Sequence, residues 1–257
     1  MGKIKDVIKA IEEFAPRSLQ GDFDNCGLKL GDVENELHGV LVTLDTNETV
    51  VDEAIAKNCN LIIEHHPSIF HAVKKFDYAL PLTKAMTKAI KNDIAIYSAH
   101  TNVDFADDGL NDYAAKQLGL LNVRKTGEPC DPRMGELEKE VTLEEFYQTV
   151  KKTYNDKNAT YIGDPNKIIR RVAVVNGGGG SHEDDLLTAV RSGADVFVTG
   201  DVKYSVARLA KDAGYAIIQV GHYDSEQGFS DLMSDLLEKV IGKEKIYKAT
   251  TLLNPYN

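Results

Sequence analysis

The sequence predicts an α/β protein built from two lobes, each with a mainly parallel or mixed sheet. Three observations carry this prediction. Short apolar segments alternate with amphipathic helical segments over residues 40–119, the alternation stops over residues 121–165, and it resumes over residues 168–241. Strands that alternate with helices favour βαβ units. We therefore expect an N-terminal lobe at 1–125 and a C-terminal lobe at 126–257, with a connector and one helix at 126–165.

The N-terminal lobe is expected to begin with a helix near residues 3–15, where apolar residues recur at helical spacing until Pro16. The Gly-, Asp- and Asn-rich residues 20–32 are predicted to form a loop. Three strands and three helices then alternate, and Asn47 is a candidate cap for the first of these helices. The strands are expected at 39–45, 60–67 and 94–102, and the helices at 47–58, 81–93 and 109–120.

The C-terminal lobe repeats the pattern after a charged segment that contains several prolines. A helix is predicted at 141–154, because Thr142 and Glu145 have the spacing of a capping box. Beyond it, strands are expected at the start of 168–180, 195–204 and 215–226, and helices at 182–193, 205–214 and 226–242.

Composition disfavours several classes of protein. The chain has 257 residues, a formal net charge of -10 and a pI near 5.2, with no Lys/Arg-rich run, so nucleic acid is not expected as the main partner. No stretch approaches the length of a transmembrane helix, and the N-terminus lacks the apolar core of a signal peptide. The cysteines form no CxxC pair, which favours reduced thiols and a cytoplasmic location. They are Cys26, Cys59 and Cys130.

Polar clusters follow three of the predicted strands, which is where ligands bind in open α/β sheets. The first is His65-His66 between Glu64 and Pro67. Two adjacent histidines can face one site only if the chain leaves strand geometry there, and Pro67 favours that. Taken alone, the pair is equally well explained as polar residues at a strand end.

The other two clusters each hold a histidine and a carboxylate four residues apart. They are His100 with Asp104, and His222 with Glu226. Asp224 and Gln227 resemble a capping box, which would put Glu226 in the first turn of a helix. Each cluster alone also fits a structural explanation, namely loop polarity or helix capping.

Together the clusters predict a metal centre. The histidines His65, His66 and His222 with the carboxylates Asp104 and Glu226 suit Zn, Mn, Fe or Co. Five ligands are too many for one closed tetrahedral site, so they fit two divalent ions with Glu226 bridging them.

A glycine run, Gly177–Gly180, stands between a predicted strand and a predicted helix. It matches neither GxGxxG nor a P-loop. Its backbone amides could hold a phosphate, or the glycines could form a tight turn that packs closely. The neighbouring His182 is expected on the surface.

The combined motifs resemble the GTP cyclohydrolase I type 2-like family, whose members are also called NGG-interacting-factor-three-like proteins. The matching segments cover nearly the whole chain in order: FDNCGLKLGD, LVTLDTNETVVDEAI, NLIIEHHPSIF, YSAHTNVDFADDGLND, VAVVNGGGG, DVFVTGDVKY and GHYDSEQGF. The resemblance implies a dinuclear metal centre between two α/β lobes, and a homo-oligomer, often a hexameric ring. It assigns the metal ligands to His65, His66, Asp104, His222 and Glu226, and it places His100 beside the centre as a candidate for proton transfer or substrate contact.

Some features depart from the family pattern. Residues 121–165 are too short for the inserted domain of longer members. Phe23 stands where Trp is common. Glu64 stands where a small residue is frequent, so it either adds a carboxylate near the metals or points away.

Two functions of different classes follow. The first is a dinuclear-metal-dependent hydrolase acting on a small molecule, such as a nucleotide; the family reaction opens the guanine ring of GTP. No residue set that would recognise guanine can be identified. The second is a non-enzymatic role in metal handling or as a partner-binding oligomeric scaffold. A redox metal enzyme is a weaker third alternative, because such sites usually place carboxylates on bundled helices.

Overall fold

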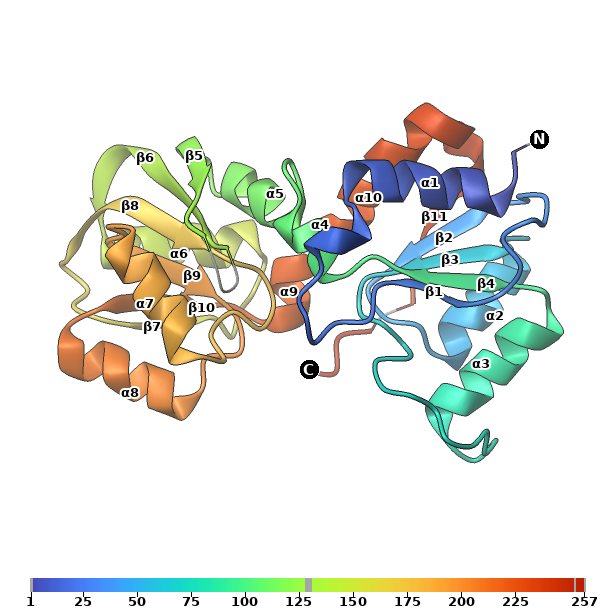
Figure 1. Cartoon of the computed structure of the whole chain (residues 1–257). Coiled ribbons are helices and arrows are strands. Elements are labelled where there is room, and N and C mark those ends of the chain that lie inside the picture. The colour runs from blue at the N-terminus through green and yellow to red at the C-terminus, as the bar shows by residue number, and fades with distance from the viewer. Residues whose placement is uncertain (1, 128–130, 252, 257) are drawn as a thin grey trace. The chain divides into compact units, whose positions relative to one another are not determined.

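A computed structural model of the chain describes residues 2–127, 131–251 and 253–256 (Figure 1). The chain divides into two compact units, one made of residues 1–106 and 229–257 and the other of residues 107–228. This division differs from the predicted boundary at residue 125. The C-terminal helix and last strand return to the first unit, and the helix that begins near residue 110 packs in the second.

The first unit contains a five-stranded sheet with the order β1-β4-β3-β2-β11. The strands β4, β3, β2 and β11 are parallel, and β1 pairs antiparallel with β4 at the edge. The strand β1 lies in the segment that the sequence predicted to be a loop. The prediction missed it because its four residues, which begin at Gly27 and are followed by Gly31, give too short an apolar pattern. The strands are β1 (Gly27–Leu30), β2 (Val40–Thr43), β3 (Leu61–Glu64), β4 (Ala95–Ser98) and β11 (Ile246–Lys248).

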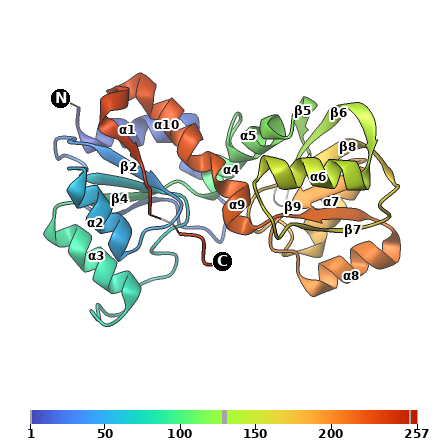
Figure 2. The ribbon, with the colours of Figure 1, turned by 180° about the vertical axis from the view of Figure 1, so that it is seen from behind.

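Helices cover both faces of this sheet (Figures 1 and 2). On one face α2 and α3 bury Val50 and Met86 against Leu41, Ile62 and Ile96 of the strands. On the other face lie α1 and α10. The helices and short 3-10 turns of this unit are α1 (Ile4–Phe14), η1 (Arg17–Leu19), α2 (Glu48–Ala56), α3 (Pro81–Lys91), α4 (Thr101–Phe105), η2 (Lys243–Lys245) and α10 (Gly228–Ile241), whose first residue belongs to the second unit.

The second unit contains a six-stranded mixed sheet with the order β5-β6-β8-β9-β10-β7. The neighbouring pairs β8–β9 and β9–β10 are parallel, and the pairs β5–β6, β6–β8 and β10–β7 are antiparallel. Residues 121–165, where the predicted alternation stops, supply β5, β6 and β7 of this sheet. All five residues of β5 are exposed, and the alternation of Leu121 and Val123 with polar residues is too short to identify a strand in the sequence. The strands are β5 (Leu121–Lys125), β6 (Arg133–Thr142), β7 (Thr160–Ile162), β8 (Ile168–Val174), β9 (Val196–Thr199) and β10 (Ala216–Gln219).

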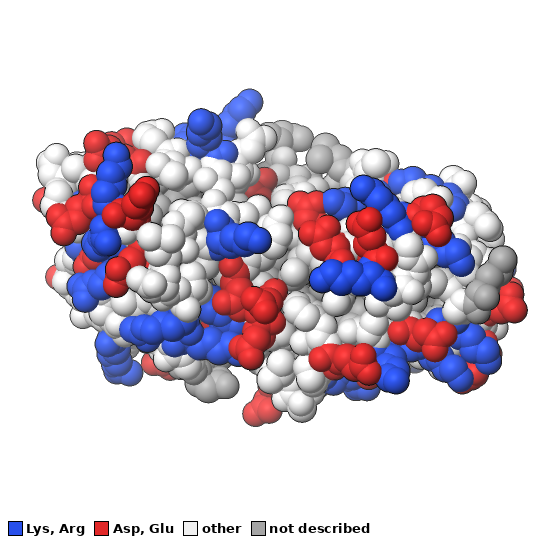
Figure 3. Space-filling model, turned by 90° about the horizontal axis from the view of Figure 1, so that it is seen from above, with Lys and Arg blue, Asp and Glu red and all other residues white. Residues whose placement is uncertain are grey.

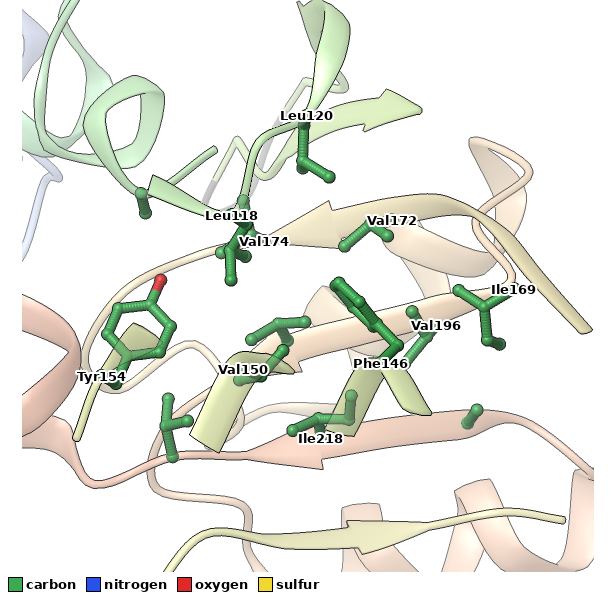
Figure 4. Packing of buried hydrophobic residues seen from close by; sticks show 14 of the residues in the cluster. Leu118, Leu120, Phe146, Val150, Tyr154, Ile169, Val172, Val174, Val196 and Ile218 are labelled. Atoms are coloured by element: carbon green, nitrogen blue, oxygen red, sulfur yellow. The ribbon is translucent and has the colours of Figure 1, made fainter. Parts of the chain in front are cut away.

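The second sheet also has helices on both faces. Phe146 and Val150 of α6 pack on one face against strand residues such as Val172, Val196 and Ile218 (Figure 4). On the other face, α7 and α8 bury a second apolar cluster. The predicted capping box of α6 is confirmed, since Thr142 accepts the N–H of Glu145 and the Glu145 carboxylate accepts the N–H of Thr142. The helices are α5 (Leu110–Gln117), α6 (Leu143–Thr153), α7 (Glu183–Arg191), α8 (Tyr204–Ala213) and α9 (His222–Glu226).

The two sheets confirm the predicted fold class, and most strands and helices lie where the sequence predicts them. Asn47 caps α2 by accepting the N–H of Val50. Cys26 and Cys59 are buried free thiols, and Cys130 lies outside the described residues. Within the described residues, every helix is too short or too polar to cross a bilayer.

Candidate metal centre

His65 and His66 follow directly after β3, where the chain leaves strand geometry as predicted. The backbone N–H groups of both residues donate to the carbonyl of Leu44. This turn brings the two rings to one side, with centroids 5.0 Å apart. His65 is completely buried and packs against Phe229, at a centroid distance of 4.7 Å.

The end of the neighbouring strand β4 adds His100 and Asp104. His100 is the N-cap of α4, and the N–H of Asp104 donates to the His100 carbonyl one turn later. The Nε2 atom of His65 lies 3.7 Å from Oδ1 of Asp104. A ring nitrogen of each of His65, His66 and His100 lies within 4.8 Å of the others. Because β3 and β4 are parallel neighbours, these four residues gather at one edge of the first sheet.

Nδ1 of each of these three histidines lies within hydrogen-bond distance of a different oxygen atom. Nδ1 of His65 lies 2.9 Å from the carbonyl oxygen of Ala99, and Nδ1 of His66 lies 3.0 Å from Oδ1 of Asp45. Nδ1 of His100 lies 2.8 Å from Oδ1 of Asp24. A carbonyl or ionised carboxylate only accepts hydrogen bonds, so each Nδ1 carries a proton, and in the neutral imidazole the lone pair is then on Nε2. This arrangement is typical of metal-binding histidines.

The second unit repeats the arrangement at the carboxyl ends of β9 and β10. His222 and Glu226 lie on α9, and Nε2 of His222 is 3.2 Å from Oε2 of Glu226. Nδ1 of His222 lies 2.7 Å from Oδ2 of Asp201, which follows β9. Glu226 is almost fully buried, and His222 is partly exposed.

The predicted capping box at Asp224 is not formed, because the N-cap of this helix lies three residues earlier. The N-cap of α9 is Gly221, whose N–H donates to the buried carboxylate of Asp156 at 2.8 Å. Asp224 therefore lies inside α9, and burial raises the pKa of its carboxyl above the usual value. Glu226 lies in the last turn of α9 rather than in the first turn of a helix.

Close packing explains the glycine run. Gly177 has a positive φ, and a Cβ there would lie 2.0 Å from Oε1 of Glu226. A Cβ on Gly180 would lie 2.5 Å from the carbonyl oxygen of Gly200. Three acidic residues occupy the first turn of the following helix and already complement its positive end, so this end is poorly suited to phosphate. They are Glu183, Asp184 and Asp185.

Glu64 points into the first unit, where its Oε1 atom accepts three hydrogen bonds. The donors are the backbone N–H of Ser68 at 2.7 Å, the Ser68 hydroxyl at 2.9 Å and the Ser98 hydroxyl at 2.6 Å. Burial raises the pKa of this fully buried carboxyl. Its contacts therefore fasten the turn that carries His65.

The donor atoms suit a transition-metal ion. Ligand atoms about 2.1 Å from one tetrahedral ion lie about 3.4 Å from each other, given the usual Zn–N and Zn–O lengths. The His65–Asp104 separation of 3.7 Å and the His222–Glu226 separation of 3.2 Å are close to this value. Mixed imidazole and carboxylate donors with oriented rings therefore fit Zn, Mn, Fe or Co in both units.

Comparison with known proteins agrees with the predicted resemblance. The model of a family described as Duf34/NIF3 (NGG1p interacting factor 3) matches residues 2–253. The chain belongs to the Duf34/NIF3 family. A relative from Clostridium acetobutylicum, named GTP cyclohydrolase 1 type 2 homolog, is 38% identical over 248 residues, which cover 94% of this chain and 91% of the relative.

Solved Duf34/NIF3 structures share the whole fold. A Bacillus cereus protein related to NIF3 matches with a TM-score of 0.90 and 25% identity, covering 100% of this chain and 99% of that chain. A hypothetical protein from Staphylococcus aureus matches with a TM-score of 0.90 and 30% identity, covering 99% and 98%. The predicted fold class and family are thus confirmed.

Sequence reasoning missed the residues that orient the histidines in this Duf34/NIF3 chain. Asp45 and Asp201 also follow strands, so their position was an available signal. Asp24 lies in an irregular loop, and Ala99 acts through its backbone carbonyl, so no pattern in the sequence distinguishes either of them.

Proposed function

We propose that this chain is a dinuclear-metal-dependent hydrolase. Its metal ligands would be His65, His66, Asp104, His222 and Glu226. The observation that carries the proposal is the oxygen atom that lies 2.7–3.0 Å from Nδ1 of each of His65, His66 and His222, which favours the Nδ1–H tautomer. Rings oriented in this way do not have to reorganise when they bind a metal ion.

The ligand set is compatible with Zn, Mn, Fe or Co. Two divalent ions would supply an acidified water molecule and would stabilise negative charge on the attacked group. The chain supplies the orientation: Asp45 fixes the ring of His66, and Asp201 fixes the ring of His222. Gly177 leaves room for the carboxylate of Glu226.

His100 is the proposed proton-transfer residue. One of its ring nitrogens lies within 4.8 Å of ring nitrogens of His65 and His66. Its Nδ1 forms a hydrogen bond with Asp24, so Nε2 is the ring nitrogen that can accept a proton. A ring nitrogen with an available lone pair is suited to general base catalysis.

The proposed substrate is a small molecule, and a nucleotide is the first candidate. Relatives carry the name GTP cyclohydrolase 1 type 2 homolog, so hydrolytic opening of the guanine ring is the first reaction to test. Water is consumed and one ring carbon–nitrogen bond is broken. On the face drawn in Figure 3, Lys and Arg side chains are interspersed with Asp and Glu, which favours a small substrate over a nucleic acid.

We also propose a homo-oligomer, with a hexameric ring as its first candidate form, in the cytoplasm. The edge strand β5 supports association with a further copy, since Leu121 and Val123 are exposed on it. The free thiols of Cys26 and Cys59 are compatible with a reducing compartment.

The test combines metal content and turnover. The protein is purified with added Mn, Zn or Fe(II), the metal per chain is counted, and hydrolysis of a nucleotide panel that includes GTP is measured. The variants are His65→Ala/His222→Ala for the ligands and His100→Gln for proton transfer. His182→Ala is the matched control, because His182 is an exposed histidine outside both clusters.

We expect close to two metal ions per chain, loss of both metal and turnover in the double variant, and loss of turnover alone in His100→Gln. Two ions per chain without turnover of any substrate would instead favour metal handling or a scaffold role. Metal below one ion per chain, unchanged by the double substitution, would refute the dinuclear centre.

A further inference from the structure

Asp24 lies in the loop before β1, yet its side chain is 0% exposed. Its Oδ1 atom lies 2.8 Å from Nδ1 of His100 and also accepts the backbone N–H of Asn25 at 2.7 Å. Its Oδ2 atom accepts the N–H of Thr101 at 3.1 Å, the Thr101 hydroxyl and the Cys26 thiol at 3.1 Å. Five donors therefore fix a single buried carboxylate.

These donors keep the Asp24 carboxylate ionised. Burial by itself raises the pKa of Asp24, but the hydrogen bonds from His100, Thr101 and Cys26 outweigh it and hold this pKa well below the usual value. An ionised carboxylate has no hydrogen to donate, so the proton shared with His100 belongs to Nδ1.

The ring of His100 is thereby fixed in both tautomer and direction. Its centroid lies 5.1 Å from that of His65 and 5.7 Å from that of His66, and one of its ring nitrogens lies within 4.8 Å of theirs. Since Nδ1 is bound to Asp24, the lone pair that remains is on Nε2.

We infer that Asp24 is a positioning residue: it holds His100 as the Nδ1–H tautomer and keeps the Nε2 lone pair available beside His65 and His66. The chemical consequence rests on the proposed hydrolase function. An Nε2–H tautomer would present a hydrogen to the site and could not accept a proton there. Asp24 contacts neither the predicted ligands nor a substrate in this role, and it acts through His100.

The experiment reads the tautomer directly. All histidines are labelled with ¹⁵N, and the zinc-loaded full-length protein is studied by solid-state NMR above pH 8. Solid-state NMR is chosen because it can be applied to an oligomer of any size. The signals of His100 are identified by their absence in His100→Gln. The test variant is Asp24→Ala. The control is Cys26→Ala, which removes a donor to the same carboxylate but leaves the contact with His100.

We expect His100 of the unmodified protein to show only the Nδ1–H form. Asp24→Ala should introduce the Nε2–H form, and Cys26→Ala should not. An unmodified protein in which His100 has Nε2–H would overturn the inference, and that measurement needs no variant to fold. An unchanged tautomer in folded Asp24→Ala would overturn it as well.

The same samples separate this inference from the proposed function. If a hydrolysed substrate is found, Asp24→Ala should lower kcat about 10- to 100-fold, the range seen when an orienting partner of a site histidine is removed. Its KM and metal content should stay unchanged. A zinc-bound signal for Nε2 of His100 would support the tautomer assignment but refute the proton-transfer role. Turnover insensitive to His100→Gln would refute that role too.

Discussion

Gly177 lies so close to Glu226 that a Cβ on residue 177 would lie 2.0 Å from Oε1 of Glu226. Gly177 also has a φ of 60°, and its N–H donates to the hydroxyl of Ser225 at 3.0 Å. The glycine run thus shapes the space that the carboxylate of Glu226 occupies. The glycine is required by packing and by backbone conformation at once.

Gly177→Ala is therefore expected to displace Glu226 and weaken metal binding at least about 10-fold, as the loss of contacts that orient a metal ligand commonly does. The measurement is a zinc titration against a chelator. Gly178→Ala is the matched control in the same loop, because the nearest heavy atom to its Cβ would be 3.8 Å away and its φ is not positive. Equal affinities of the two variants would contradict the proposed role of Glu226.

Asp201 allows a second test of the proposed ligands His222 and Glu226. Its Oδ2 atom lies 2.7 Å from Nδ1 of His222, so Asp201→Ala releases the ring without removing a predicted ligand. Metal affinity should fall about 10- to 100-fold, while the fold persists. Asp212→Ala is the control, because Asp212 is an exposed aspartate that pairs with Arg208 on α8. If both aspartate variants bind zinc as the unmodified protein does, Asp201 does not orient a metal ligand.

The predicted ligands and the residues that orient them differ in how visible they are in the sequence. His65 and His222 stand out because they follow short apolar strands, and neighbouring parallel strands end at one edge of a sheet. Asp24 reaches His100 across 76 positions of the chain through an irregular loop. Such a contact depends on tertiary packing, which no local periodicity encodes.

The same distinction holds for the fold. The helix at 143–153 was predictable because a capping box and amphipathic spacing agree there. Strand β5 was missed because all of its residues are exposed, and β11 because its three residues find their partner β2 far back in the chain. The unit boundary was missed for the same reason, since the return of α10 to the first unit is a non-local event.

We expect acid to weaken the contact between Glu53 of α2 and the C-terminal residues Thr250 and Thr251. Its carboxylate accepts hydrogen bonds from the N–H and hydroxyl groups of Thr250 and Thr251, at 2.7–3.0 Å, and pairs with Lys57. Burial raises the pKa of Glu53, but the hydrogen bonds from Lys57, Thr251 and Thr250 outweigh burial and lower it from 4.5 to about 2.

Because the folded-state pKa is the lower one, this group stabilises the fold above pH 4.5 and loses that contribution as the pH falls towards 2. Glu53→Gln should reduce the free energy of unfolding by about 1–3 kcal/mol at pH 7. The difference from the unmodified protein should shrink between pH 4.5 and 2, measured by urea denaturation. Glu13→Gln is the control, since Glu13 is exposed and pairs only with Lys9 at 3.6 Å among the described ion pairs. A pH-independent difference for Glu53→Gln would exclude this linkage.

Substitutions of Glu64 test whether the turn after β3 requires the hydrogen-bond acceptor of this side chain or its negative charge. Its Oε1 atom accepts from Ser68 and Ser98, and the turn that it fastens carries His65. Glu64→Ala leaves these donors without their acceptor and should lower the free energy of unfolding by about 1–3 kcal/mol. Metal affinity should fall with it, because His65 is no longer held in place.

Glu64→Gln keeps an oxygen of the same reach and should retain most of the stability and the metal affinity. Thermal unfolding with and without zinc measures both quantities on the same samples. A Gln variant as impaired as the Ala variant would show that the carboxylate charge acts on the centre. Glu64 would then belong with the residues that tune the metals, although its Oε1 atom bonds to Ser68 and Ser98.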